Sequence, residues 1–150
     1  MGNYVVKQIN DLSKVDLSLL IKESKEDGFR FVERLVNDYH DGTNTFSQHG
    51  EALFGVFNEH GEIVVIGGVN IDPFSDRPNT GRLRRFYVSR EYRRNGLGSL
   101  LLKSIIDEAS KHFSILVLHT DTIDADRFYT SYGFTKGDAY PNSTHYMELH

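Results

Sequence analysis

Residues 82–99 read RLRRFYVSREYRRNGLGS: a strand expected over 82–89, a short basic turn, and two glycines that open a helix. The helix is expected over residues 95–113, because apolar side chains recur there with the period of about 3.6 residues that places them on one face. These side chains are Leu97, Leu100, Leu101, Ile105 and Ala109. The apolar run that follows, residues 114–119, is typical of a strand covered on both faces. Strand, helix and strand together predict a crossover unit with two parallel strands in the middle of a sheet.

The segments on either side of this unit predict antiparallel strands and further helices. Residues 52–57 and 63–71 are expected to form a hairpin around Asn58-Glu59-His60-Gly61, because turn residues separate two apolar runs. The remaining strands are expected at residues 4–9, 134–140 and 144–149, and the remaining helices at residues 11–25, 29–40 and 124–132.

The order of elements is β-α-α-β-β-β-α-β-α-β-β, and this order indicates the fold class. It predicts an α/β (α+β) fold in which a mixed, mostly antiparallel, twisted sheet of about seven strands carries helices on both faces. We expect a single domain over residues 1–150, because the chain shows no repeat, low-complexity tract or linker.

The composition narrows the class of protein. The chain has 150 residues, of which 39% are hydrophobic and 25% charged, and its formal net charge is −4. It has no cysteine, which excludes disulfides, thiolate nucleophiles and cysteine zinc sites. No apolar run is long enough to span a membrane and no secretory signal is present, so we expect a cytoplasmic protein that binds no membrane.

Arginines gather in one segment of this acidic chain. Six of its ten arginines fall between Arg82 and Arg94. One polyanionic ligand would explain such a cluster, since nucleic-acid binding usually needs a broad basic face. A solvated strand edge, where charge discourages edge pairing, explains it equally well on charge alone.

The basic turn before the helix has the features of a pyrophosphate site. Backbone N–H groups in the first turn of a helix lack internal partners, and the helix dipole attracts anions to that end. Gly96 and Gly98 let a phosphate approach the backbone, and Arg93 and Arg94 add positive charge. The spacing is neither that of a P-loop nor that of a three-glycine dinucleotide fingerprint. Packing glycines or a plain turn are the alternative that these residues leave open.

Two motifs resemble those of the GNAT superfamily of acetyl-CoA-dependent N-acetyltransferases. Arg93-x-x-Gly96-x-Gly98 is similar to the family's Arg/Gln-x-x-Gly-x-Gly/Ala signature, which lies between the fourth strand and the third helix. Residues 125–134, ADRFYTSYGF, resemble the family's Ala-x-x-Phe/Leu-Tyr-x-x-x-Gly-Phe. The resemblance extends over residues 53–149, and the first third of the chain matches only in its helical character.

The resemblance implies acetyl-CoA as the donor and co-substrate. Backbone groups of residues 86–88 would pair with the pantetheine arm and the acetyl carbonyl, and residues 94–99 would hold the pyrophosphate mainly through N–H groups. Thr122 stands where the family often has asparagine, and it would offer its hydroxyl. The implied cofactor-binding residues are Phe86, Tyr87, Val88, Arg93, Arg94, Asn95, Gly96, Leu97, Gly98, Ser99 and Thr122.

Tyr129 is the catalytic residue that the resemblance implies. In the implied mechanism an uncharged amine attacks the thioester directly in a ternary complex, a backbone N–H near Val88 stabilises the oxyanion, and the tyrosine protonates the departing thiolate. A phenol with a pKa near 10 donates to a thiolate with a pKa near 8.5 at a cost of about 2 kcal/mol. The alternative is that Tyr129 only packs beside Phe128.

The acceptor is expected to be a primary amine of a small molecule or peptide. The sequence singles out no general base; the candidates are Glu51, Asp72, His119 and Asp121. Arg84 and Arg85 lead to the hypothesis that the acceptor carries a carboxylate or a phosphate.

Other functions and partners are weighed against this one. A CoA-binding sensor without turnover stays open, because no base is visible and Thr122 replaces the usual asparagine. Nucleic acid is not expected as a partner, because the chain as a whole is acidic. No metal site is expected, since Asp121, Asp124 and Asp126 lack the spacing of a calcium loop. We expect a monomer or a homodimer.

Overall fold

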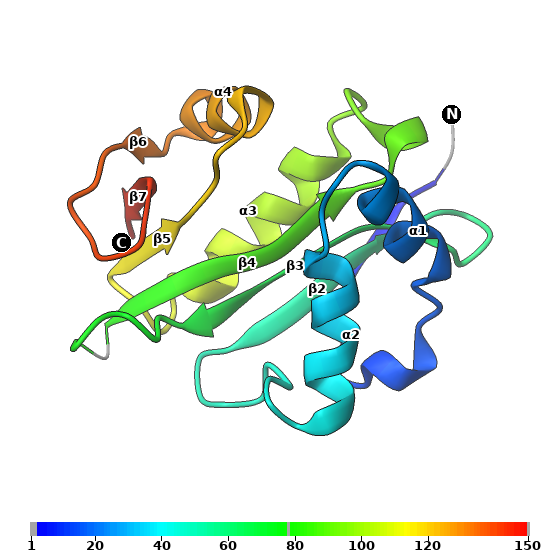
Figure 1. Ribbon diagram of the computed structural model, residues 1–150, viewed down its shortest axis with the longest axis horizontal. Helices are drawn as coiled ribbons and strands as arrows, with labels where there is room; N and C mark the ends of the chain where they lie inside the picture. The colour runs from blue at the N-terminus through cyan, green and yellow to red at the C-terminus, as the bar shows by residue number, and fades with distance from the viewer. Residues whose placement is uncertain (1–2, 78, 150) are drawn as a thin grey trace.

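The computed structural model describes residues 3–77 and 79–149, which build one seven-stranded sheet (Figure 1). The strands lie in the order β1-β2-β3-β4-β5-β7-β6; β4 and β5 run parallel, and the other neighbours run antiparallel. The strands are β1 (Val5–Gln8), β2 (Ala52–Phe57), β3 (Ile63–Ile71), β4 (Thr80–Val88), β5 (Ile115–Leu118), β6 (Thr135–Lys136) and β7 (His145–Glu148).

Helices cover both faces of the sheet. In Figure 1, α1 and α2 lie in front of the sheet and α3 lies behind it; α4 packs into the same core as α3. The helices are α1 (Ser18–Glu26), α2 (Phe31–Asp41), α3 (Leu97–Ala109) and α4 (Ile123–Tyr132), with the short 3-10 helices η1 (Leu12–Lys14) and η2 (Arg90–Tyr92). The predicted mixed, mostly antiparallel sheet with helices on both faces is confirmed, as is the predicted order of its strands and α-helices.

Most predicted elements have nearly the expected bounds, and the hairpin of β2 and β3 matches to the residue. The helix expected over residues 11–25 is interrupted. The Asp11 side chain accepts a hydrogen bond from the Ser13 N–H and caps a single 3-10 turn, and Val15 is extended before α1 begins. A local side-chain cap thus competes with the continuous helix that the apolar period predicts.

Two further boundaries differ for reasons of backbone geometry. The helix expected from residue 95 begins at Leu97, because Gly96 has a φ of 78° and cannot be part of the helix. The strand expected over residues 134–140 is reduced to the two residues of β6. The Gly137 N–H donates to the Thr144 carbonyl, and the chain then turns through Asn142, which has a φ of 54°.

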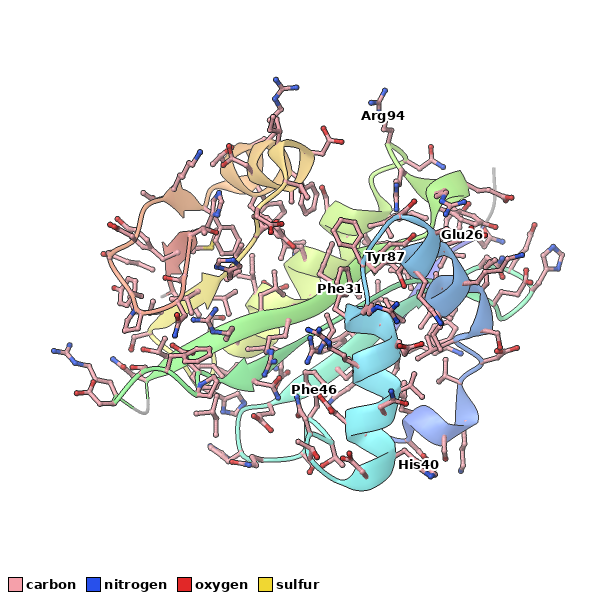
Figure 2. All side chains as sticks on the ribbon, viewed as in Figure 1. Glu26, Phe31, His40, Phe46, Tyr87 and Arg94 are labelled. Carbon is pink, nitrogen blue, oxygen red and sulfur yellow. The ribbon has the colours of Figure 1, made fainter. Side chains whose placement is uncertain are left out.

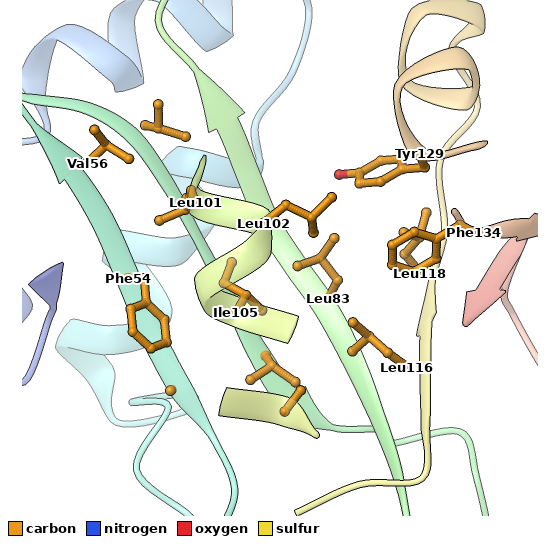
Figure 3. Packing of buried hydrophobic residues seen from close by; sticks show 14 of the residues in the cluster. Phe54, Val56, Leu83, Leu101, Leu102, Ile105, Leu116, Leu118, Tyr129 and Phe134 are labelled. Carbon is orange, nitrogen blue, oxygen red and sulfur yellow. The ribbon is translucent and has the colours of Figure 1, made fainter. Parts of the chain in front are cut away.

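Two hydrophobic cores lie on the two faces. Figure 3 shows the larger one, in which the apolar stripe of α3 packs on β2, β4 and β5 and on the aromatic rings beside α4. Leu101, Leu102 and Ile105 are each 0% exposed there. The smaller core buries Leu20 of α1 with Val32 and Leu35 of α2 against the opposite face of the sheet. Both faces of β2, β3 and β4 are therefore covered.

The parallel pair is joined over only part of its length. Thr80, Gly81 and Arg82 of β4 pair with residues 115–117 of β5, whereas β4 continues to Val88 beside β3 alone. Beyond Arg82 the two strands separate, so no strand among the described residues lies beside the β5-facing backbone edge of β4. We call this opening the wedge.

A β-bulge bends β4 beside the wedge. Arg85 and Phe86 together oppose Gly67 of β3, and Arg85 has a φ of 61°. Gly67 is required at this point, because a Cβ atom there would lie 2.7 Å from the Phe86 ring. The bulge changes the direction of the strand at the start of residues 86–88, whose backbone was predicted to bind the donor.

A buried ion pair lies at the closed end of the wedge, where β4 and β5 begin to separate. The Arg82 Nε donates to the Asp72 Oδ1 at 2.8 Å, and its Nη1 and Nη2 each donate at 2.9 Å to the carbonyls of Asn142 and Pro141. The side chains of Arg82 and Asp72 are 5% and 0% exposed. Arg82 therefore ties β4 to the loop between β6 and β7, on the far side of the wedge.

We predict that Arg82→Leu lowers the free energy of unfolding by about 3–5 kcal/mol, because it leaves the buried carboxylate of Asp72 without a counter-ion. Adding Asp72→Leu should recover part of the loss, since both buried charges are then gone. Urea unfolding followed by circular dichroism measures both changes. Lys103→Gln, which breaks an exposed ion pair with Asp107, is the control and should change little. An Arg82→Leu loss as small as that of the control would contradict the structural role of this pair.

Candidate functional site

The turn between η2 and α3 presents a row of unused backbone donors. Leu100 is the first residue of this region whose N–H reaches back, to the Gly96 carbonyl. In the described part of the chain, no acceptor pairs with the N–H groups of residues 94–99. Arg94 and Gly96 both have positive φ, 66° and 78°, a backbone conformation that can turn successive N–H groups toward one anion. The sequence predicted the unpartnered N–H groups and the open glycine, but not the positive φ of Arg94.

The two glycines of the turn have different structural roles. A Cβ atom on Gly96 would meet nothing within 4 Å, so its hydrogen faces open space. Gly98 is buried, and a Cβ atom there would lie 3.3 Å from Val88 and 3.4 Å from Phe128. Gly96 thus leaves the approach to the N–H groups clear, whereas Gly98 lets the first turn of α3 pack closely on β4 and α4.

The arginines of the turn are mostly engaged by α1. Arg93 donates from Nη2 to Asp27 Oδ2 at 3.0 Å, and Arg90 pairs with Glu26 at 2.9 Å. Arg94 is exposed, and Figure 2 shows it at the outer end of the turn, pointing away from the body of the molecule. The cationic side chain at the mouth is therefore Arg94, whereas Arg93 helps to hold the turn in place.

Glu23 of α1 fixes the start of this turn from inside. It is 8% exposed, and its carboxylate accepts the Arg90 N–H at 2.9 Å and the Ser89 hydroxyl at 3.2 Å. Asp27, one helical turn later, accepts the Tyr87 hydroxyl at 2.9 Å as well as Arg93. Burial alone would raise the pKa of Asp27, but the hydrogen bonds from Tyr87 and Arg93 outweigh burial and lower it. The sequence analysis missed both acids, although their spacing on one face of a helix opposite an arginine-rich turn is a usable signal.

The backbone N–H and C=O groups of Val88 face the wedge. The Ser89 N–H donates to the Val64 carbonyl of β3, so the N–H and C=O of Val88 point away from β3. The Arg93 Nε donates to that carbonyl at 3.0 Å. Arg93 thereby occupies the acceptor of Val88 and leaves the N–H of Val88 as the available donor on the wedge side.

Tyr129 projects from α4 into an aromatic group beside the wedge. Its ring centroid lies 6.1 Å from Phe86, 5.1 Å from Phe128 and 5.6 Å from Phe134. Figure 3 shows its hydroxyl directed from α4 toward β4. Burial raises the pKa of Tyr129, because the phenolate would lose its hydration. The side chain therefore stays protonated across the neutral range.

Comparison with known proteins identifies the family. The model of the acetyltransferase (GNAT) family matches residues 17–134. The chain belongs to the GNAT acetyltransferase family. The family predicted from the two motifs is confirmed, and acetyl-CoA is the donor that the family implies.

Relatives agree with this assignment. An N-acetyltransferase of Schizosaccharomyces pombe, described as uncharacterized, is 40% identical over 86 residues, which cover 55% of this chain and 51% of that protein. The match thus spans about half the length of this curated relative. A crystal structure assigned as an acetyltransferase from Exiguobacterium sp. 255-15 has a TM-score of 0.88 at 29% identity and covers 97% of this chain and 93% of its own. A GNAT-family acetyltransferase from Staphylococcus aureus Mu50 shares the fold, with a TM-score of 0.76, 19% identity, and coverage of 99% and 100%.

Thr122 of this GNAT chain has a structural contact. Its Oγ1 accepts the Ala125 N–H at 3.2 Å and caps α4. The hydroxyl hydrogen is still available for donation, so the predicted contact with the donor stays a prediction.

Two acidic candidates for the general base are already bound to other groups of the protein. Glu51 accepts the N–H groups of Gln48 and Ile71 and the side chain of Asn70, at 2.9–3.2 Å. Asp72 pairs with Arg82. His119 and Asp121 are exposed in the loop after β5 and stay candidates.

A second buried contact beside Tyr129 escaped the sequence analysis. His145 of β7 is 1% exposed, and its Nε2 lies 2.7 Å from Asp126 Oδ1 of α4. The hydrogen bond with His145 is the main reason why the pKa of Asp126 is lowered. This contact fastens α4, and with it Tyr129, to the end of the sheet.

A metal centre and a membrane-spanning helix are features of other classes of protein. No group of three or more His, Asp or Glu side chains in these ranges could hold a metal ion. None of the helices in the same ranges is long and apolar enough to cross a membrane.

We predict that the protein loses stability as the pH rises above about 10. Burial raises the pKa of Tyr87 and Tyr129, and the hydrogen bond to Asp27 raises that of Tyr87 further. The unfolded chain releases both protons near pH 10, whereas the folded chain keeps them, so each tyrosine costs up to about 1.4 kcal/mol per pH unit. Urea midpoints between pH 8 and 11 measure the slope. Tyr129→Phe should make the slope shallower; an unchanged slope would mean that the phenol ionises freely in the folded protein.

Proposed function

We propose that this chain is an acetyl-CoA-dependent N-acetyltransferase that moves an acetyl group to a primary amine of a small molecule or peptide. The observation that supports it most is the row of unpaired N–H groups over residues 94–99, directly beside the open edge of β4. A diphosphate and an extended, amide-containing arm need this combination, and acetyl-CoA contains both. The single domain, the cytoplasmic location and the monomeric or dimeric state stay predictions.

The donor would lie across the end of the sheet. Its pyrophosphate would accept hydrogen bonds from residues 94–99, with Arg94 adding charge from the exposed side. Its pantetheine arm would follow the β5-facing edge of β4 like an added strand, using wedge-facing backbone groups within residues 86–88. Tyr87 would offer neither its side chain, which is turned to the α1/α2 core and bonded to Asp27, nor its N–H and C=O groups, which point toward Ile66 of β3.

The chemistry would take place in the wedge. The uncharged amine attacks the thioester carbonyl directly, so that a C–N bond forms and the C–S bond then breaks. The Val88 N–H would stabilise the negative charge on the acetyl oxygen, and Tyr129 would give its proton to the sulfur of the leaving thiolate. The surplus proton on the nitrogen would leave through water and restore the phenol, so that the products are the neutral amide and the free thiol. Because burial raises the pKa of Tyr129, its proton transfer to a thiolate costs more than the about 2 kcal/mol of an ordinary phenol. Tyr129 would therefore act as the C–S bond breaks, when the sulfur is most basic.

Gly96→Ala is predicted to weaken the binding of CoA by about tenfold or more. The added methyl would lie where the phosphate approaches, and Ala would strain the positive φ that aligns the N–H groups. Gly61→Ala is a matched control, because Gly61 has a φ of 77°, is likewise open within 4 Å, and lies in the turn between β2 and β3. Isothermal titration calorimetry with CoA compares them. Equal affinities for both variants, or no heat with the wild type, would contradict the proposed donor site.

Tyr129→Phe is predicted to lower kcat by about 10²-fold, the lower end of the range for a general acid, with a small effect on the Kd for acetyl-CoA. Tyr132→Phe on the same helix is the control and should retain activity. Thiol release from acetyl-CoA with a panel of amines provides the rate. Unchanged turnover of Tyr129→Phe would remove this residue from the mechanism, and binding of acetyl-CoA without any amine-dependent release would favour a sensor over an enzyme.

A further inference from the structure

Three arginines of β4 face different surroundings, and their charges are not equally matched. Arg82 is paired with Asp72 at 2.8 Å. Arg85 lies 3.5 Å from Asp38 of α2. Arg84, between them, makes no hydrogen bond or ion pair with any described residue, although it is only partly exposed. One positive charge is therefore left over beside the wedge.

The nearby acids do not supply the missing partner. Asp72 and Asp38 are each paired with another arginine. Both oxygens of Glu51 accept hydrogen bonds from other groups of the protein. Burial, followed by the neighbouring charge of Arg82, lowers the pKa of Arg84 from its usual value, so both act against its positive charge. A bound anion would stabilise the charged guanidinium, because its hydrogen bonds replace the lost hydration and its negative charge offsets the repulsion from Arg82.

Arg84 lies on the face of the sheet opposite the donor site. Leu83 points into the core of α3, so Arg84, the next residue along the strand, points to the face that carries α1 and α2. Its pairing partner Gly68 lies against Phe46, which belongs to that same side. The proposed donor site, with the first turn of α3 and with Tyr129, is on the α3/α4 side. The wedge begins at Arg82, two residues before Arg84, and connects the two faces.

We propose that Arg84 binds an anionic group of the acceptor, a carboxylate or a phosphate, so that the substrates are small primary amines that carry a negative charge. This inference rests on the proposed function. The donor would fill the α3/α4 side, so the amine has to reach the thioester through the wedge from the other face, where Arg84 stands. A guanidinium forms strong, charge-assisted hydrogen bonds with either kind of anion, and it repels a second positive charge on a polyamine.

Matched acceptors test this with the whole protein. β-Alanine is compared with 3-amino-1-propanol, and O-phosphoethanolamine with ethanolamine, so that each pair differs in its charge; spermidine represents polycations. We expect kcat/KM for one of the two anionic amines to exceed that of its neutral counterpart by about tenfold or more. The two pairs distinguish a carboxylate from a phosphate. Equal rates within both pairs, or spermidine as the best acceptor, would overturn the proposal.

Arg84→Gln then tests the residue itself, with Arg77→Gln, an exposed arginine in the loop between β3 and β4, as the matched control. Arg84→Gln should reduce the ratio between anionic and neutral acceptors to about one, chiefly through the KM of the anionic amine, while the Kd for acetyl-CoA stays as in the wild type. The control should keep the ratio. A preserved ratio in Arg84→Gln, or weakened donor binding in its place, would overturn the assignment to Arg84. Failure of the wild type to bind acetyl-CoA or to release thiol with any amine would instead contradict the proposed function.

Discussion

The separation of β4 from β5 beyond Arg82 is the constraint on which the rest of the structure depends. A strand in the middle of a sheet normally has partners on both edges, and its backbone groups are then unavailable to a ligand. Here β4 is paired along its whole length with β3 but only over residues 80–82 with β5. Arg82 holds the closed end together by linking Asp72 to the carbonyls of the loop between β6 and β7. The open end is held by other contacts, those of α1 with the basic turn.

Those contacts give the arginines of this segment a structural role. The sequence predicted that Arg93 and Arg94 add positive charge to a diphosphate site made mainly of backbone N–H groups, yet Arg93 is paired with Asp27 at the end of α1, as Arg90 is with Glu26. Positive side chains in this segment thus shape the turn, and the turn then presents N–H groups of residues 94–99. Backbone donors are fixed in position once the turn is fixed, whereas long arginine side chains lose much conformational freedom when they bind. A site made mainly of backbone is therefore better organised before the ligand arrives.

Local sequence patterns predicted the fold well and the site only partly. The hairpin of β2 and β3, the helix α3 and the glycine turn follow from periodicity and turn residues, which act over a few positions. The break at Val15 and the short β6 depend on a side-chain cap and on a loop, and periodicity does not detect either. Glu23 and Asp27 are about sixty residues distant from the turn they hold, so only the folded chain shows that they meet. The sequence also could not predict that Arg84 is unpaired, because this depends on the partners that Asp38, Glu51 and Asp72 have in the folded chain.

The two faces of the sheet would provide two different kinds of anion recognition. On the α3/α4 side, N–H groups of a fixed turn suit a diphosphate, whose shape is the same in every CoA thioester. On the α1/α2 side, the planar guanidinium of Arg84 would match the paired oxygens of a carboxylate or of a phosphate. The wedge connects the two faces, so a negatively charged amine would be drawn to the side of Arg84 while the donor occupies the other. Arg84 would attract the anionic group and leave the amine, which must lose its proton before attack, free to enter the wedge; a neutral or polycationic amine would receive no such guidance from Arg84.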